Sequence, residues 1–135
     1  MTIKERHLRK DAFLQVHVFH SLNNLNDGFD AMNINYFKEW QFRIVLERCK
    51  AMGIGLYGIE PWKNGEFFDL ITLDESLYKA DDPQWYFEAF EKLISLGEDL
   101  DYSASFNVPI KLLELDYYPA NPYYLHHNKA SDRKE

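Results

Sequence analysis

The chain has 135 residues, 46% of them hydrophobic and 16% aromatic, and it carries a net charge of −7 with one cysteine. This size fits a single domain, residues 1–135, and the apolar content supports a packed core, which excludes wholesale disorder. One thiol excludes a disulfide framework, no apolar run approaches the roughly 20 residues of a membrane-spanning helix, and no secretory signal stands out, so we expect a cytoplasmic protein.

Residues 1–10 are polar and basic, and we expect them to be a flexible end. The first apolar segment, residues 12–19, fits two structures. A two-residue period favours a strand, with apolar members Leu14, Val16 and Val18. A helical period uses Leu14, Val18, Leu22 and Leu25. We favour the strand and keep the helix as the alternative.

A helix is predicted at about residues 36–52, where Gly53 suits the left-handed position after the last turn. Its main apolar stripe comprises Phe37, Trp40, Ile44, Val45 and Met52. Further apolar residues, Phe42, Leu46 and Cys49, fall outside that stripe. A helix that is apolar around most of its circumference is buried on two faces or contacts another chain, so we expect a homodimer through this helix.

A β-hairpin is predicted from residues 55–60 and 66–73, which flank Asn64-Gly65. Asn-Gly is the preferred pair for a type I′ turn, because both central residues need a positive φ. Pro61 interrupts the pattern, so we expect the first strand to end near Glu60.

The strongest pattern in the chain predicts a helix at residues 83–96. Asp82 is a good N-cap, Pro83 suits the first turn, and Gly97 suits the end of the helix. Its apolar and polar residues separate onto opposite faces, as in a helix that rests on a core.

The C-terminal region contains three segments. Residues 109–116 fit a strand by alternation, or a short helix opened by Pro109. Residues 117–125 hold four tyrosines and two prolines, which suits either an extended segment across the domain or a docking strip for a partner. Residues 127–135 form a charged tail that we expect to be flexible.

These elements predict an α+β fold: an antiparallel sheet of about four strands with two main helices on one face. With strands at 12–19 and 109–116, the order is βαββαβ, the arrangement of ferredoxin-like folds. The loop from His20 to Asn35 is long for that fold, and long loops inside compact domains are often functional.

Signatures of catalysis and of metal binding are weak. His17 and His20 could share a metal with the His126-His127 pair only if they lie on a helix, because a strand points them to opposite faces. Cys49 lies among apolar residues and reads as a buried thiol rather than a nucleophile. The glycines do not complete a phosphate-binding loop, and no G-x-S-x-G motif is present. We therefore expect no cofactor and no metal.

Among the many carboxylates, Glu60 differs from the rest. It precedes Pro61 and Trp62, and an apolar indole beside a carboxylate can desolvate it. The alternative is that Glu60 is an exposed residue at the end of a strand.

Charge is distributed unevenly along the chain. Residues 1–59 hold 6 acidic and 8 basic side chains, whereas residues 60–116 hold 14 acidic and 4 basic ones. A negative field repels nucleic acid and attracts basic proteins, although acidic surfaces also serve solubility alone.

The main functional hypothesis is therefore a non-catalytic acidic binding protein of the immunity, antitoxin or inhibitor type. It would occlude a basic protein partner such as a nuclease or toxin, without binding nucleic acid or a membrane. The predicted contacts are Glu60, Trp62, Glu66, Asp69, Asp74, Glu75, Tyr78, Asp99, Asp101 and Tyr102. One alternative is a small enzyme or ligand-binding domain whose site lies near Glu60, His17 and His20. The other is a structural subunit that only oligomerises.

Overall fold

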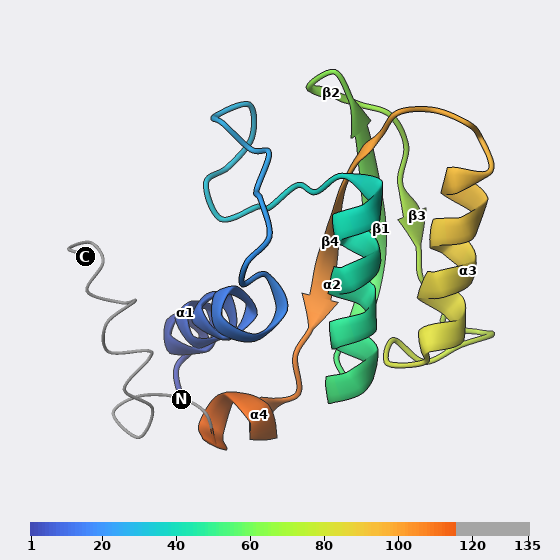
Figure 1. The fold of residues 1–135 in the computed structure, drawn as a ribbon. Coiled ribbons are helices and arrows are strands. Elements are labelled where there is room, and N and C mark those ends of the chain that lie inside the picture. Colours follow the sequence, from blue (N-terminus) through green and yellow to red (C-terminus); the bar gives the residue numbers. More distant parts are fainter. Residues whose placement is uncertain (116–135) are drawn as a thin grey trace. The chain divides into compact units, whose positions relative to one another are not determined.

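A computed structural model describes residues 1–115 (Figure 1). Its residue contacts group into two compact units, one formed by Met1–Ser21 with Val108–Glu135 and the other by Leu22–Asn107. Each unit is described by itself below. In the described part of the chain, no helix is long and apolar enough to cross a membrane.

The regular elements described in the first unit are all helices. Helix α1 spans Ile3–Phe13, a short π-helix follows at Leu14–Val18, and α4 spans Ile110–Leu115. The strands predicted at 12–19 and 109–116 are therefore wrong, and the βαββαβ order built on them does not hold.

Local capping explains why α1 forms where a flexible end was expected. The Thr2 hydroxyl accepts a hydrogen bond from the Glu5 backbone at 3.0 Å, and the Glu5 carboxylate accepts one from the Thr2 backbone at 3.0 Å. This capping box satisfies two backbone donors at the N-terminus of the helix. At the start of α4, the backbone carbonyl of Pro109 accepts a hydrogen bond from the Leu112 amide.

The second unit contains an antiparallel sheet of four strands. Strand β1, Gly55–Lys63, lies at its centre and pairs along most of its length with β4, Asp101–Asn107. On its other side β1 pairs with two short strands, β2 at Glu66–Phe67 and β3 at Ile71–Thr72. The sheet confirms the predicted α+β class.

The hairpin prediction is confirmed at its turn, because Asn64 and Gly65 have φ of 54° and 77°. Its strands differ from the prediction in two ways. Strand β1 continues through Pro61, whose carbonyl accepts from the Phe68 and Asp69 amides. Because both amides bond to the same carbonyl, the regular pairing with β1 stops between β2 and β3. The predicted strand 66–73 is therefore two short strands.

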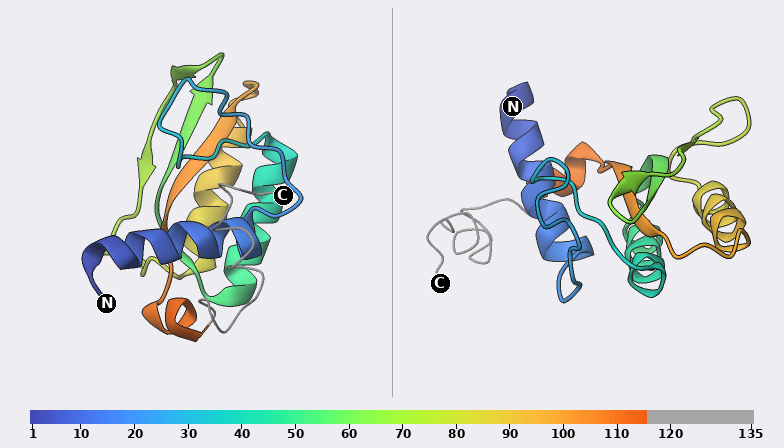
Figure 2. Two further views of the ribbon diagram at one scale, coloured as in Figure 1. Left: turned by 90° about the vertical axis from the view of Figure 1, so that its left-hand side faces the viewer. Right: turned by 90° about the horizontal axis from the view of Figure 1, so that it is seen from above.

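Helices α2, Glu39–Met52, and α3, Pro83–Ile94, both lie on one face of the sheet, as predicted (Figure 2). Asp82 caps α3 by accepting from the Gln84 amide at 2.9 Å. The core between helices and sheet is aromatic. The Phe42 ring lies 5.4 Å from Phe90 and stacks 5.3 Å from Tyr102.

The buried stripe of α2 differs from the predicted one. Its buried apolar members are Phe42, Val45, Leu46 and Cys49. Trp40, placed on the predicted stripe, is 64% exposed. The buried residues recur at helical spacing, and three of them are those that the sequence analysis placed outside the main stripe.

Candidate functional site

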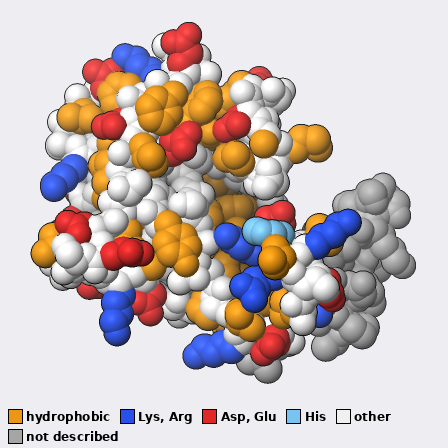
Figure 3. All heavy atoms as spheres, turned by 180° about the vertical axis from the view of Figure 1, so that it is seen from behind, with side chains coloured by type: hydrophobic (Ala, Val, Ile, Leu, Met, Phe, Trp, Pro, Cys, Tyr) orange, Lys and Arg blue, Asp and Glu red, His pale blue; other side chains and the backbone are white. Residues whose placement is uncertain are grey.

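The face of the sheet that α2 and α3 leave uncovered contains a hollow of about 220 Å³. We call it the sheet pocket. It is lined by Ile34, Tyr36, Gly58, Glu60, Leu70, Ser103, Ala104 and Ser105. All of these residues belong to the second unit. Figure 3 shows the corresponding side of the molecule, where carboxylates and apolar side chains are intermixed.

Small residues form the floor of the sheet pocket. In the pairing of β1 with β4, Gly58 lies opposite Ser105 and Glu60 lies opposite Ser103, so these four residues share a face. A Cβ at Gly58 would lie 3.3 Å from the Ile71 carbonyl oxygen and 3.7 Å from the Ser105 hydroxyl. The hollow exists because this part of the sheet carries no large side chain.

The loop between Leu22 and Lys38 supplies one wall, and two asparagines shape it. The Asn26 amide donates to the carbonyls of Ala31 and Ile34, both at 2.8 Å. Asn24 accepts from the Tyr36 amide at 2.9 Å. These bonds hold Ile34 and Tyr36 in place, which explains how a loop without regular structure can border a pocket.

Aromatic rings gather at the end of the sheet pocket. The Trp62 ring lies 5.4 Å from Phe29, 5.5 Å from Tyr36 and 6.4 Å from Phe67. These residues come from the loop, β1 and β2. The cluster therefore joins the loop to the hairpin and buries Tyr36 completely.

The polar groups of the pocket are connected by hydrogen bonds. The Trp62 Nε1–H donates to Oε2 of Glu60 at 2.6 Å. The Tyr36 hydroxyl donates to Asp30, which lowers the pKa of that carboxyl. Burial, and then the bond to Asp30, raise the pKa of the Tyr36 phenol. The Trp62 indole lies beside Glu60 as a hydrogen-bond donor, whereas the sequence analysis considered it as an apolar group that desolvates the carboxylate.

Four of the predicted contact residues follow one another along the edge of the sheet, from β2 to the turn after β3. We call them the acidic hairpin surface: Glu66, Asp69, Asp74 and Glu75, all of them exposed. Among residues 1–115 they form no ion pair. Apolar side chains lie between or directly after them in the chain: Phe67, Phe68, Leu70 and Leu77 are 57%, 36%, 48% and 71% exposed.

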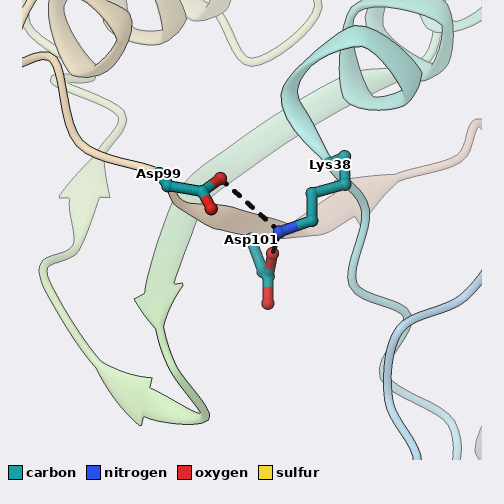
Figure 4. A network of polar contacts seen from close by, with 3 residues as sticks. All are labelled: Lys38, Asp99 and Asp101. Carbon is teal, nitrogen blue, oxygen red and sulfur yellow. Dashed lines mark hydrogen bonds and ion pairs between the residues drawn. The ribbon is translucent and has the colours of Figure 1, made fainter.

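Two further predicted carboxylates, Asp99 and Asp101, are partly neutralised. Lys38 lies 2.9 Å from Asp101 and 3.5 Å from Asp99 (Figure 4), and the contact with Asp101 raises the pKa of Lys38. This lysine comes from the first 59 residues, so tertiary structure places a cation where the sequence suggested none. The carboxylates of the acidic hairpin surface have no such cation within residues 1–115.

Two predicted aromatic contacts have different surroundings. Tyr102 is 1% exposed and lies between Phe42 and Phe90, so it does not lie on the surface as the prediction required. Its position in β4 explains the burial, because its side chain faces the helices. Tyr78 is half-buried and donates to Glu88 at 3.1 Å.

The remaining candidates are not among the lining residues of the sheet pocket. His17 and His20 belong to the first unit and Glu60 to the second. Within the described range, no group of three or more His, Cys, Asp or Glu side chains could hold a metal ion. Burial raises the pKa of the Cys49 thiol to about 12. His126, His127 and the segment 117–125 lie outside the described residues.

Sequence reasoning missed strand β4 and, with it, the serines of the pocket. The signal was present, since Tyr102, Ala104 and Phe106 alternate with Ser103 and Ser105. Chemically, the pocket combines a carboxylate, a phenol and hydroxyl groups on a floor of small residues. Comparisons of the chain with protein-family models, with curated proteins and with solved structures find no match.

Proposed function

We propose that the protein is a binding protein whose acidic hairpin surface covers a basic face of a protein partner. The observation that carries this proposal is the set of four exposed carboxylates without an ion pair within residues 1–115. Charges that are not neutralised within residues 1–115 remain available to a partner, and they raise the rate of encounter with a cationic surface.

Exposed apolar side chains supply the second requirement of an interface. Phe67 and Leu70 lie within the same stretch as Glu66 and Asp69, and both are about half exposed. Apolar area that a partner covers contributes contact free energy, whereas exposed charges contribute mainly specificity and rate. The combination favours occlusion of a partner over a purely solubilising role, and immunity, antitoxin and inhibitor proteins work by such occlusion.

The sheet edge here favours contact through side chains rather than by strand addition. Strands β2 and β3 have two residues each, and the segment between them leaves the ladder. A short, interrupted and charged edge is a poor template for another strand. A partner would therefore contact the side chains of this surface, with Glu60 and Trp62 at its border.

The test uses a fluorescent lysine-rich peptide of about 20 residues and two double variants that remove the same charge. Glu66→Gln/Glu75→Gln changes the acidic hairpin surface, and Glu47→Gln/Glu88→Gln changes exposed positions on α2 and α3. Anisotropy titrations at rising NaCl measure the affinity. We expect the first variant to lose roughly threefold to tenfold in affinity at low salt and the second to lose little.

Affinity of the unchanged protein should fall steeply as salt rises, because exposed charges are screened within about 10 Å at 0.1 M salt. Equal losses of affinity in the two variants would show that peptide binding depends only on the net charge of the protein. That result, or a complex insensitive to salt, contradicts the proposal.

A further inference from the structure

We infer that the sheet pocket binds a primary alkylammonium group, with Glu60 as its counter-ion. The cation can belong to a free small amine or to a lysine side chain. In the second case the inference rests on the proposed function, because the lysine would be that of the basic partner. The site itself is defined by the pocket and not by the acidic hairpin surface.

Hydrogen bonding within the protein decides which ligand groups the pocket can accept. The Tyr36 hydroxyl proton is directed to Asp30. The Ser103 hydroxyl lies within 3.2 Å of the Glu60 backbone oxygen, to which it donates. Tyr36 and Ser103 also share a hydrogen bond, and both residues are buried, so these two hydroxyls are engaged within the protein and offer no donor to a ligand.

Glu60 adds the charge. Its Oε2 accepts the indole N–H of Trp62, and its Oε1 accepts no hydrogen bond within residues 1–115. The side chain is half-buried, and the indole restricts where the carboxylate points. A carboxylate that is oriented before binding loses less entropy when it pairs with a cation.

The pocket therefore offers the Glu60 carboxylate, with its negative charge, and the Ser105 hydroxyl as acceptors. An ammonium group has three N–H donors, one positive charge and no acceptor, which matches this set. A carboxylate or phosphate would instead meet lone pairs and a negative charge. The Ser105 hydroxyl accepts no hydrogen bond among the described residues and can adapt to either role.

Shape supports a small alkyl chain behind the ammonium. A volume of about 220 Å³ is below the roughly 300–1,000 Å³ typical of sites for drug-sized ligands. Gly58 leaves room in the floor, while Ile34 and Leu70 provide apolar surface at the sides. The stem of a lysine side chain, or a chain of a few carbons, fits such surroundings.

Trp62 provides a direct reporter because its indole N–H bonds to Glu60. The chain has three tryptophans, so a ¹H–¹⁵N spectrum of the ¹⁵N-labelled full chain contains three indole signals. Trp62→Phe assigns the reporter. Trp85, whose Nε1 donates to the buried carbonyls of Leu56 and Ala80, is an internal control.

The probes are n-butylammonium and the peptide acetyl-Gly-Lys-Gly-amide, with butyrate and the matching norleucine peptide as controls. We expect both ammonium probes to shift the Trp62 signal in a saturable way, with Kd in the millimolar range, and the controls to leave it unchanged. Tighter binding of butylammonium identifies a free amine as the preferred source. Tighter binding of the peptide identifies a lysine.

Two variants test the named residues. Glu60→Gln keeps an oxygen for the Trp62 indole but removes the charge, and should weaken binding about tenfold or more. Ser105→Val narrows the pocket, leaves Glu60 unchanged, and should weaken binding severalfold. The matched control Glu66→Gln removes a charge outside the pocket and should change Kd less than twofold.

The inference is overturned if neither ammonium probe gives a saturable shift, if butyrate shifts Trp62 equally, or if Glu60→Gln binds as tightly as the unchanged protein. The two proposals fail separately. Butylammonium binding that persists in Glu66→Gln/Glu75→Gln supports the pocket, whatever the lysine-rich peptide shows at the acidic hairpin surface.

Discussion

The two faces of the sheet in the second unit differ in the size and packing of their side chains. On one face Phe42, Phe90 and Tyr102 form a closely packed aromatic layer beneath α2 and α3. On the other face Gly58, Ser103 and Ser105 leave a hollow bordered by Glu60. One sheet thus carries stability on one side and an accessible polar site on the other, because side chains alternate along each strand.

The largest expected effect is at the packed face. Phe42→Ala removes a fully buried ring that contacts both Phe90 and Tyr102, and should lower the free energy of unfolding by about 3–5 kcal/mol. Ser105→Ala, on the open face, should change it by less than about 0.5 kcal/mol. Urea unfolding measures both. Similar losses at the two positions would remove the distinction between the faces.

Two glycines of β1 differ in the space that surrounds them. A Cβ at Gly55 would lie 2.7 Å from the Ala80 backbone carbon, whereas the nearest atom to one at Gly58 is 3.3 Å away. Neither residue needs glycine for a positive φ. We expect Gly55→Ala to cost about 1–3 kcal/mol or more, and Gly58→Ala less. Thermal unfolding of the two variants decides, and a larger loss for Gly58→Ala would contradict the reasoning.

Tyr36→Phe tests the wall of the open face. It removes the donor to Asp30 and should cost about 1 kcal/mol. Because that bond lowers the folded pKa of Asp30, it stabilises the protein above about pH 4 and the benefit is lost as pH falls through the folded pKa. NMR titration should find the Asp30 pKa raised in the variant. An unchanged value would show that another group holds the carboxylate.

A further prediction concerns the accessibility of Cys49, which lies on the packed side. Its thiol is fully buried and its pKa is raised to about 12, so little thiolate exists at pH 8. Reaction with a disulfide reagent at pH 8 should be slow in the native protein and fast in urea. Fast native labelling would show that this part of the core opens readily.

Substitution of Trp40 tests the proposed homodimer through α2. It is the large apolar side chain that α2 leaves 64% exposed. Sedimentation over a range of concentrations compares the unchanged protein with Trp40→Ser. If α2 mediates dimerisation, the variant should dissociate at higher concentration, and identical behaviour would place any dimer interface elsewhere.

Local signals correctly predicted several elements. Asp82, Pro83 and an amphipathic pattern defined α3, and Asn64-Gly65 defined the hairpin turn. These predictions succeeded because caps and turns depend on neighbouring residues in the chain. The prediction for residues 12–19 was wrong, because Leu14 and Val18 fit both a strand period of two and a helical period. In the structure this segment continues from the capped helix α1.

The candidate site could be predicted only in fragments. The proximity of Trp62 and Glu60 was expected from their closeness in the chain, whereas their place on one strand was not, because β1 continues through Pro61. The contributions of Tyr36, Ser103 and Asp30 did not, because they depend on β4 pairing with β1 and on a loop shaped by Asn24 and Asn26. The buried position of Tyr102 was missed for the same reason.

By itself, the sequence determined the α+β class, the α3 helix, the hairpin turn and the excess of carboxylates after residue 59, since these follow from composition and short-range spacing. Tertiary structure decided which carboxylates keep their charge unpaired and where a pocket opens. The physical reason is that ion pairs such as Lys38 with Asp101, and the meeting of Gly58 with Ser105, join residues far apart in the chain. Charge and cavity are properties of the folded surface, and no local pattern encodes them.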